Sequence, residues 1–140
     1  MSQWTHVNAS IRYDGIPNLM GDPITESELG KPVTFFDDFD DCILPCGTEG
    51  SLEYEIIRTH KYSDGHIACR AVIFTGDLRD YEDDDEILQY FRRITEGKWI
   101  RSGLLEIDIE FRKVLVYRYS SVGEEGPGWR LVSEIPYESD

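Results

Sequence analysis

The stretch LEIDIEF, residues 105–111, alternates strictly between apolar and acidic side chains. A period of two is typical of a β-strand that buries one face and exposes the other. This alternation constrains the fold strongly, because it requires a sheet with one apolar face on a core and one charged face in solvent. The exposed face carries Glu106, Asp108 and Glu110, here called the acidic strand face, with successive carboxylates roughly 6.6–6.8 Å apart.

Other segments show strand-like patterns as well. Some alternate in the same way, and one is apolar almost throughout, which predicts a strand inside the sheet. The Asp64-Gly65 pair favours a tight hairpin turn, and a second hairpin is expected around Arg112 and Lys113. These further strands are expected at residues 4–13, 52–57, 66–75, 114–120 and 129–135.

One main helix is expected before the strand at 105–111. Apolar residues recur at helical spacing over residues 87–94 and form one buried stripe, and Gly97 marks the end. The carboxylates of residues 80–86 fall just before and within the first turn. Free N–H groups and the positive end of the helix dipole favour anions there. The acidic run therefore indicates the start of a helix.

The acidic run also has a metal-binding interpretation. In that alternative, Asp77, Asp80 and a later aspartate hold Mg²⁺ at the end of a strand. No glycine-rich phosphate loop stands near them, so the helix start is the interpretation we adopt. Arg79 lies between two aspartates in a segment expected to be a loop. It is either a salt-bridge hub or a clamp for a carboxylate or phosphate.

Residues 15–50 are rich in proline and glycine and are expected to form a long irregular connection. One short helix is expected within it at Thr25–Leu29, where Thr25 and Glu28 form a capping box. The order of elements predicts a single α+β domain over residues 1–140, with a mainly antiparallel sheet of five to six strands and one main helix. A strand–helix–strand crossover beside a hairpin makes this a variant of the ferredoxin-like plan.

The charge balance limits the classes of partner. The chain has 28 acidic and 14 basic residues among 140, which gives a formal net charge of −14. Direct binding of nucleic acid is disfavoured because it depends on cations that displace counterions, whereas basic partners are favoured. No signal peptide or membrane-spanning run is expected. The odd number of cysteines, 3, suits a reducing compartment, so we expect a cytoplasmic protein.

Cysteine and histidine residues offer a weaker pattern. Cys42 and Cys46 have C-x₃-C spacing, and His60 and His66 follow them. A structural zinc needs four ligands around one centre, and the second pair has no recognisable spacing. Whether these residues bind a metal stays open, and no cofactor is expected. A Cys–His nucleophile has no supporting motif, so we expect no catalytic residues.

Acidic residues form the predicted contacts with a partner protein. Residues 35–41 mix aromatic and acidic side chains in a long loop, as interaction segments do. The acidic strand face either occupies a cationic groove on a nucleic-acid-binding protein or is a solvated face balanced by arginines. For a small-ligand binder, the expected residues are Arg58, Arg70 and Arg79. The predicted partner contacts are Asp37, Asp38, Asp40, Asp41, Asp83, Asp84, Asp85, Glu106, Asp108 and Glu110.

Three motifs, WTHVNASIRYDG at 4–15, LPCGTEGSLEY at 44–54 and FTGDLRDY at 74–81, carry a resemblance. Together they resemble a family of small bacteriophage and prophage proteins of Gram-positive bacteria. The resemblance transfers no catalytic residue. It implies an inhibitor of a basic host protein that handles nucleic acid or serves in defence, comparable to an anti-CRISPR and acting by occlusion. The alternative is an oligomeric small-ligand binder, such as a sponge for a nucleotide immune signal.

Overall fold

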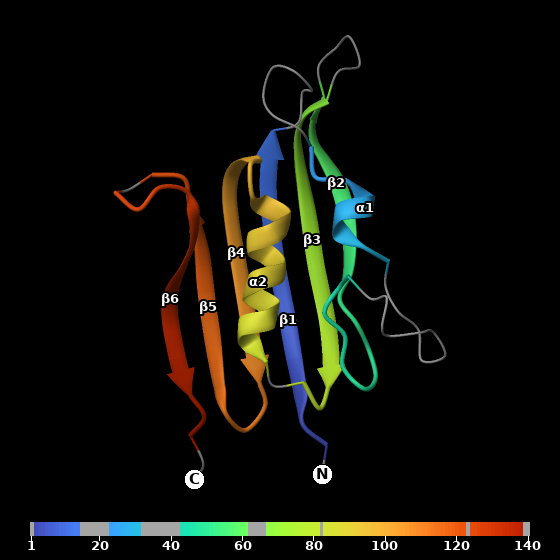
Figure 1. Cartoon of the computed structure of the whole chain (residues 1–140), viewed down its shortest axis with the longest axis vertical. Helices are drawn as coiled ribbons and strands as arrows, with labels where there is room; N and C mark the ends of the chain where they lie inside the picture. Colours follow the sequence, from blue (N-terminus) through green and yellow to red (C-terminus); the bar gives the residue numbers. More distant parts are fainter. Residues whose placement is uncertain are drawn as a thin grey trace.

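The computed structural model describes residues 2–14, 23–31, 43–61, 67–81, 83–122 and 124–138. Its strands form one six-stranded sheet in the order β2-β3-β1-β4-β5-β6, with every neighbouring pair antiparallel (Figure 1). The predicted mainly antiparallel α+β arrangement is confirmed. The elements are β1 (Trp4–Asp14), α1 (Glu26–Leu29), β2 (Glu53–Lys61), β3 (Ile67–Arg79), α2 (Asp84–Thr95), β4 (Trp99–Ile109), β5 (Lys113–Ser120) and β6 (Gly128–Pro136).

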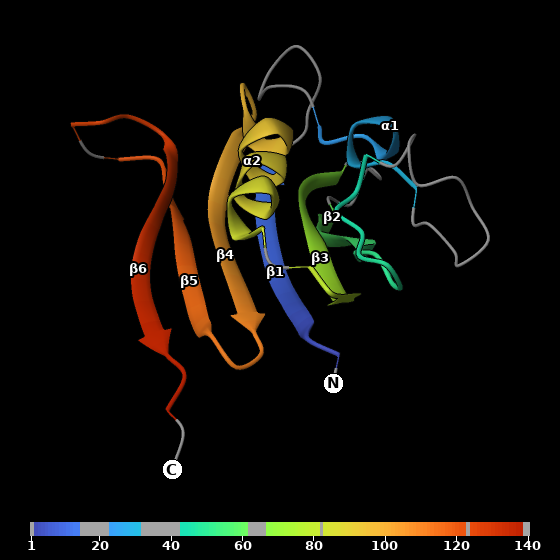
Figure 2. The same ribbon diagram turned by 60° about the horizontal axis from the view of Figure 1, so that its bottom comes forward.

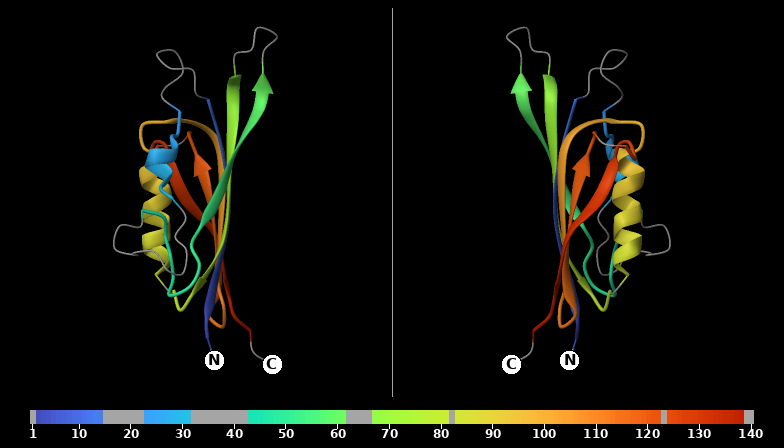
Figure 3. Two further views of the ribbon diagram at one scale, coloured as in Figure 1. Left: turned by 90° about the vertical axis from the view of Figure 1, so that its right-hand side faces the viewer. Right: turned by 90° about the vertical axis from the view of Figure 1, so that its left-hand side faces the viewer.

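The two faces of the sheet differ. Both helices lie on one face, and no described segment covers the other, here called the open face (Figure 3). α2 connects β3 to β4, two strands that are separated by β1 in the sheet. The two edges are β2 and β6 (Figure 2). One face is thus used for the core, and the other is presented to the surroundings.

The core between the sheet and α2 is centred on Phe91. This side chain is fully buried, and its ring lies edge-on to Phe74, Tyr90 and Trp129 at centroid distances of 4.9, 5.2 and 5.9 Å. Such pairs contribute about 0.5–1.5 kcal/mol each beyond the burial of their area. Because Trp129 belongs to β6, the same contacts attach the C-terminal hairpin to the helix.

The acidic run opens α2, as predicted. Asp83 is the N-cap, and its Oδ1 accepts a hydrogen bond from the Glu86 backbone N–H at 3.0 Å. Residues 84–86 supply acid to the first turn, and two arginines lie in the last, which matches the helix dipole. The helix ends at Thr95, and Gly97, with φ of +71°, turns the chain towards β4.

The predicted capping box of α1 is also present. The Thr25 side chain accepts a hydrogen bond from the Glu28 N–H, and the Glu28 carboxylate accepts one from the Thr25 N–H, each at 3.3 Å. A helix of four residues is too short to be stable alone. The hydroxyls of Tyr54 and Tyr90 hold its end by donating to backbone oxygens at 3.0 and 2.9 Å.

Two strands are longer than predicted. β3 continues to Arg79, so residues 77–79 are strand and not loop, because they pair with the first residues of β1. β4 begins at Trp99 instead of Leu105. An extra residue at Arg101 shifts the register with β1 and reverses the alternation of buried and exposed side chains. This bulge is why the pattern of period two did not extend to the start of the strand.

Candidate functional site

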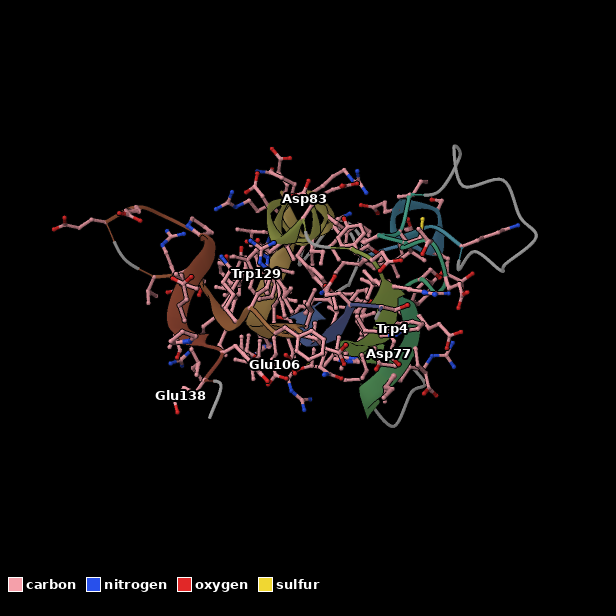
Figure 4. All side chains as sticks on the ribbon, turned by 90° about the horizontal axis from the view of Figure 1, so that it is seen from below. Trp4, Asp77, Asp83, Glu106, Trp129 and Glu138 are labelled. Carbon is pink, nitrogen blue, oxygen red and sulfur yellow. The ribbon has the colours of Figure 1, made fainter. Side chains whose placement is uncertain are left out.

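The acidic strand face lies on the open face of the sheet. Directly paired residues of an antiparallel sheet point to the same side. The register places His6 between Asp77 and Asp108, in one row across three strands. Figure 4 shows Asp77 and Glu106 on the side of the molecule opposite Asp83, which opens α2. The predicted acidic residues of β4 and those of α2 therefore face different directions.

Carboxylates predominate on the open face. The side chains of four of them, Glu53, Glu55, Glu106 and Asp108, form no hydrogen bond or ion pair with another residue in the described ranges. Strand spacing of about 4.8 Å and residue spacing of roughly 6.6–6.8 Å bring these charges close enough for their potentials to add. The face carries Glu53, Glu55, Asp77, Glu106, Asp108 and Glu110, against His6, Arg12, Arg118 and, at the edge strand, Arg130, the register partner of Arg118.

His6 is held between two carboxylates on this face. Its Nδ1 lies 2.5 Å from Asp77 Oδ1, and its Nε2 lies 2.8 Å from Glu110 Oε2. The hydrogen bonds to Asp77 and Glu110 raise the pKa of His6, although partial burial opposes them. The bond to His6 in turn lowers the pKa of Glu110. With a carboxylate on each ring nitrogen, His6 connects β1 to β3 and to the turn that follows β4.

Sequence reasoning did not select His6. No local motif marks it, and only the register of three strands brings its two carboxylate partners to it. Glu110 is committed to the fold in a second way, since its Oε1 accepts a hydrogen bond from the Trp4 N–H at 3.0 Å. Of the acidic strand face, Glu106 and Asp108 are thus the residues with charge to offer a partner.

The open face also exposes apolar side chains. Ile73 and Leu104 both pair with Ser10, one from each side, and are 38% and 53% exposed. The solvated face of an antiparallel sheet is normally polar. Exposed apolar side chains that cluster on a protein surface often mark an interaction site, whereas single scattered ones are ordinary.

A groove of about 550 Å³ continues this surface at the turn between β4 and β5. Ile135 and Tyr137 are about half exposed, at 53% and 54%, and line the groove together with acidic groups. The rings of Phe111 and Tyr137 meet edge-on at a centroid distance of 5.8 Å and form one wall of the groove. The lining includes the carboxylates Asp108, Glu110 and Glu138, the cation Lys113, and the apolar or aromatic residues Phe111, Val114, Ile135 and Tyr137.

Phe111 was predicted to be a buried strand residue, and this is wrong. β4 ends at Ile109, and Phe111 lies in the following turn with φ of +66° and 49% exposure. The left-handed conformation costs an L-residue roughly 1–2 kcal/mol, which glycine would avoid. The turn therefore holds an aromatic ring at the mouth of the groove despite this strain, and strain of this kind is a feature of functional sites.

The other predicted partner contacts are placed elsewhere. Asp83 caps α2, and Asp84 and Asp85 lie in its first turn on the helix side of the sheet. Asp37, Asp38, Asp40 and Asp41 are outside the described residues. A single flat interface cannot include both the start of α2 and the acidic strand face.

The three arginines proposed for a ligand are not brought together. Arg79 is a salt-bridge hub, with Nη1 2.5 Å from Glu49 Oε1 and with Nε and Nη2 donating to Ser2 Oγ at 3.0 and 2.8 Å. Arg70 pairs with Arg58 in the register of β3 and β2. At about 3.3 Å per residue, Arg70 and Arg79 are roughly 30 Å apart along β3.

The glycine-bracketed loop at 46–51 braces the end of β3. The Thr48 N–H donates to the Arg79 carbonyl, and the Arg79 N–H donates to the Glu49 carbonyl, each at 3.0 Å. Gly50 has φ of +78°, and a Cβ there would collide with the Asp77 carbonyl. The loop N–H groups used in this way are not available as an anion cradle. The motifs LPCGTEGSLEY and FTGDLRDY are therefore in contact.

In the described part of the chain, no three His, Cys, Asp or Glu side chains gather as metal ligands. Cys42 and His66 lie outside that part, and Cys46 is a free, half-buried thiol. None of the helices among the described residues has the length and apolarity to cross a membrane. Comparison with known proteins found no matching family model, curated protein or solved structure.

Proposed function

We propose that the protein is a non-enzymatic binding protein that engages a basic partner protein through its open face. One observation carries this proposal. The face combines unpaired carboxylates, Glu106 and Asp108, with exposed apolar side chains such as Leu104 and Ile135. A partner surface with arginine or lysine beside apolar groups complements both chemistries.

The groove supplies an anchor point within this surface. Affinity in protein interfaces is concentrated where a side chain enters a desolvated pocket. An arginine of the partner can lay its stem along the Phe111 and Tyr137 rings and direct its guanidinium to Asp108 at the rim. The strained conformation of Phe111 is consistent with selection for binding at the expense of stability.

The resemblance to phage proteins supports a more specific function, that of an inhibitor in the host cytoplasm. Its partner would be a host protein that handles nucleic acid or serves in defence. Carboxylates spaced roughly 6.6–6.8 Å apart along β4 are comparable with phosphates along an extended nucleic-acid strand. The open face would occupy a cationic groove sterically and electrostatically. We also infer a ferredoxin-like plan for β2-β3-β1-β4 with α2, since this strand order and crossover form a split β-α-β arrangement.

The test uses two variants with the same change in net charge. E106K/D108K reverses charge on the open face, and D84K/D85K reverses it at the start of α2. Wild-type protein is first used for affinity purification from a bacterial lysate, and the dominant partner is identified by mass spectrometry and purified. Association rate constants are then measured by surface plasmon resonance over a range of ionic strength.

We expect E106K/D108K to lower the association rate constant about tenfold or more, with a weaker dependence on salt. D84K/D85K should lower it only a few-fold, through net charge. Equal losses in both variants would show that net charge drives association and that the open face has no special role.

A further inference from the structure

A second cavity, on the helix side, carries charge opposite to that of the chain. It has a volume of about 660 Å³ and lies between the C-terminal half of α2 and the β5–β6 hairpin. Figure 4 shows Trp129 in this position, beneath the helix. Four cations line it, Arg92, Arg93, Lys98 and Arg130, with Glu96 as the carboxylate among the described lining residues. We propose that this cationic cavity binds a small organic phosphate.

The charge of the lining is not what the composition predicts. The chain has 28 acidic and 14 basic residues, so an average patch of its surface has twice as many carboxylates as cations. Among the described residues that line the cationic cavity, four cations stand against one carboxylate. A concave site with walls of low dielectric constant focuses the field of the charges that line it. The local potential can therefore attract an anion although the net charge is −14.

The helix dipole does not explain this arrangement. Cations in the last turn of a helix are stabilising, and this accounts for Arg92 and Arg93 alone. Lys98 comes from the turn before β4. Arg130 comes from the edge strand β6, where it pairs with Arg118, and its guanidinium turns back to donate to the Gly126 carbonyl at 2.7 Å. Cations from three separate parts of the chain thus converge on one cavity.

The two helix arginines have charge available for a ligand. Among the described residues, neither Arg92 nor Arg93 forms an ion pair. The Arg93 guanidinium lies 5.4 Å from the centre of the Tyr90 ring, and both residues line a neighbouring pocket, so Arg93 lies at the border between that pocket and the cationic cavity. Guanidinium groups match the oxygens of a phosphate through paired N–H donors.

The other two cations are positioned by carboxylates. Lys98 Nζ lies 3.0 Å from Glu28 Oε1, and Arg130 Nε lies 3.1 Å from Glu125 Oε2. The Glu125 side chain is 81% exposed, and ion pairs of this kind contribute little to stability. A phosphate can therefore replace Glu125 as the partner of Arg130 at small cost.

The size and floor of the cavity favour an organic body over a bare ion. About 660 Å³ is within the range of roughly 300–1,000 Å³ for small-molecule sites. Tyr119, Pro127 and Trp129 provide apolar wall. Trp129 is fixed in place, since its Nε1 donates to the Phe91 carbonyl at 3.3 Å and to Thr95 Oγ1 at 3.2 Å.

The Trp129 indole N–H is a suitable reporter for nuclear magnetic resonance titration, with the Trp4 indole as an internal control far from the cavity (Figure 4). The probes are adenosine monophosphate and ribose 5-phosphate, with adenosine, ribose and inorganic phosphate as comparisons at constant ionic strength. We expect a saturable shift of the Trp129 signal with at least one of the two esters, and none with its uncharged parent.

A pair of charge-matched variants tests the assignment of residues. R92Q/R93Q should weaken ester binding about tenfold or more, while R12Q/R58Q, which removes the same charge from β1 and β2, should leave it within about twofold. The absence of a saturable Trp129 shift with either ester at millimolar concentration would overturn the proposal. So would equal weakening in the two variants, or inorganic phosphate binding as tightly as the esters. This test is independent of the proposed function, because the open face takes no part in it.

Discussion

Replacement of Phe91 by alanine should cost far more stability than the same replacement at Phe111. Phe91 is fully buried, and substitutions of this kind cost about 3–5 kcal/mol. Its three edge-on ring contacts place the expected loss in the upper part of that range, about 4–5 kcal/mol. Phe111 is 49% exposed and meets one described ring, so its loss should cost about 1 kcal/mol or less.

The assay is urea unfolding followed by circular dichroism, with equal slopes required for a valid comparison. For a domain of this size, about 3–4 °C is expected per kcal/mol, so F91A should melt roughly 12–20 °C below the wild type. Binding to the basic partner should show the reverse order, because F111A removes one wall of the groove and F91A does not touch it. Unfolding free energies of the two variants within about 1 kcal/mol of each other would refute the placement of Phe91 at the centre of the core.

Two further outcomes are expected. Because Asp77 and Glu110 raise the pKa of His6, its stabilising contribution should be complete below the ordinary value of 6.5 and decline as pH rises through the higher folded-state value. The difference in unfolding free energy between the wild type and H6Q should thus shrink from about pH 5 to pH 9. A growing difference would contradict the two ion pairs of His6 with Asp77 and Glu110. At Gly50 alanine meets both a positive φ and the Asp77 carbonyl, whereas at Gly126 it meets a positive φ and open space. Unfolding by urea should show a loss of about 2–3 kcal/mol for G50A and about 1–2 kcal/mol for G126A, and equal losses would argue against the brace at the end of β3.

Several elements could be predicted because their signals are local. The alternation at residues 105–111, the helical spacing at 87–94 and the capping box at Thr25 each depend on neighbours a few residues apart. The structure confirms β4, α2 and α1 at these places. The start of α2 could be predicted for the same reason, because its acidic residues match the preference of a helix N-terminus for negative charge.

The errors concern contacts between distant segments. Residues 77–79 were expected to be loop because no local pattern shows that β1 and the 46–51 loop lie on either side of them. The bulge at Arg101 reverses the alternation within β4, and the strand end at Ile109 removes Phe111 from the core. In each case the partner strand decides the conformation, and the partner is not visible in a window of neighbouring residues.

The candidate sites divide in the same way. The acidic strand face follows from alternation alone, so Glu106 and Asp108 could be selected without a structure. The ion pairs of His6 with Asp77 and Glu110, and the cationic cavity, could not be predicted, because each is assembled by side chains from three separate segments.

The sequence by itself determined the central parts of the strands and of α2, and that one side of the sheet would be acidic. Only the tertiary structure decided that both helices share one face, that the acids of β4 and of α2 point in opposite directions, and that cations gather beside Trp129. The physical reason is the distance along the chain over which each effect acts. Backbone propensity and alternation act between near neighbours, whereas strand order, register and the packing of α2 depend on burying apolar side chains from the whole chain at once.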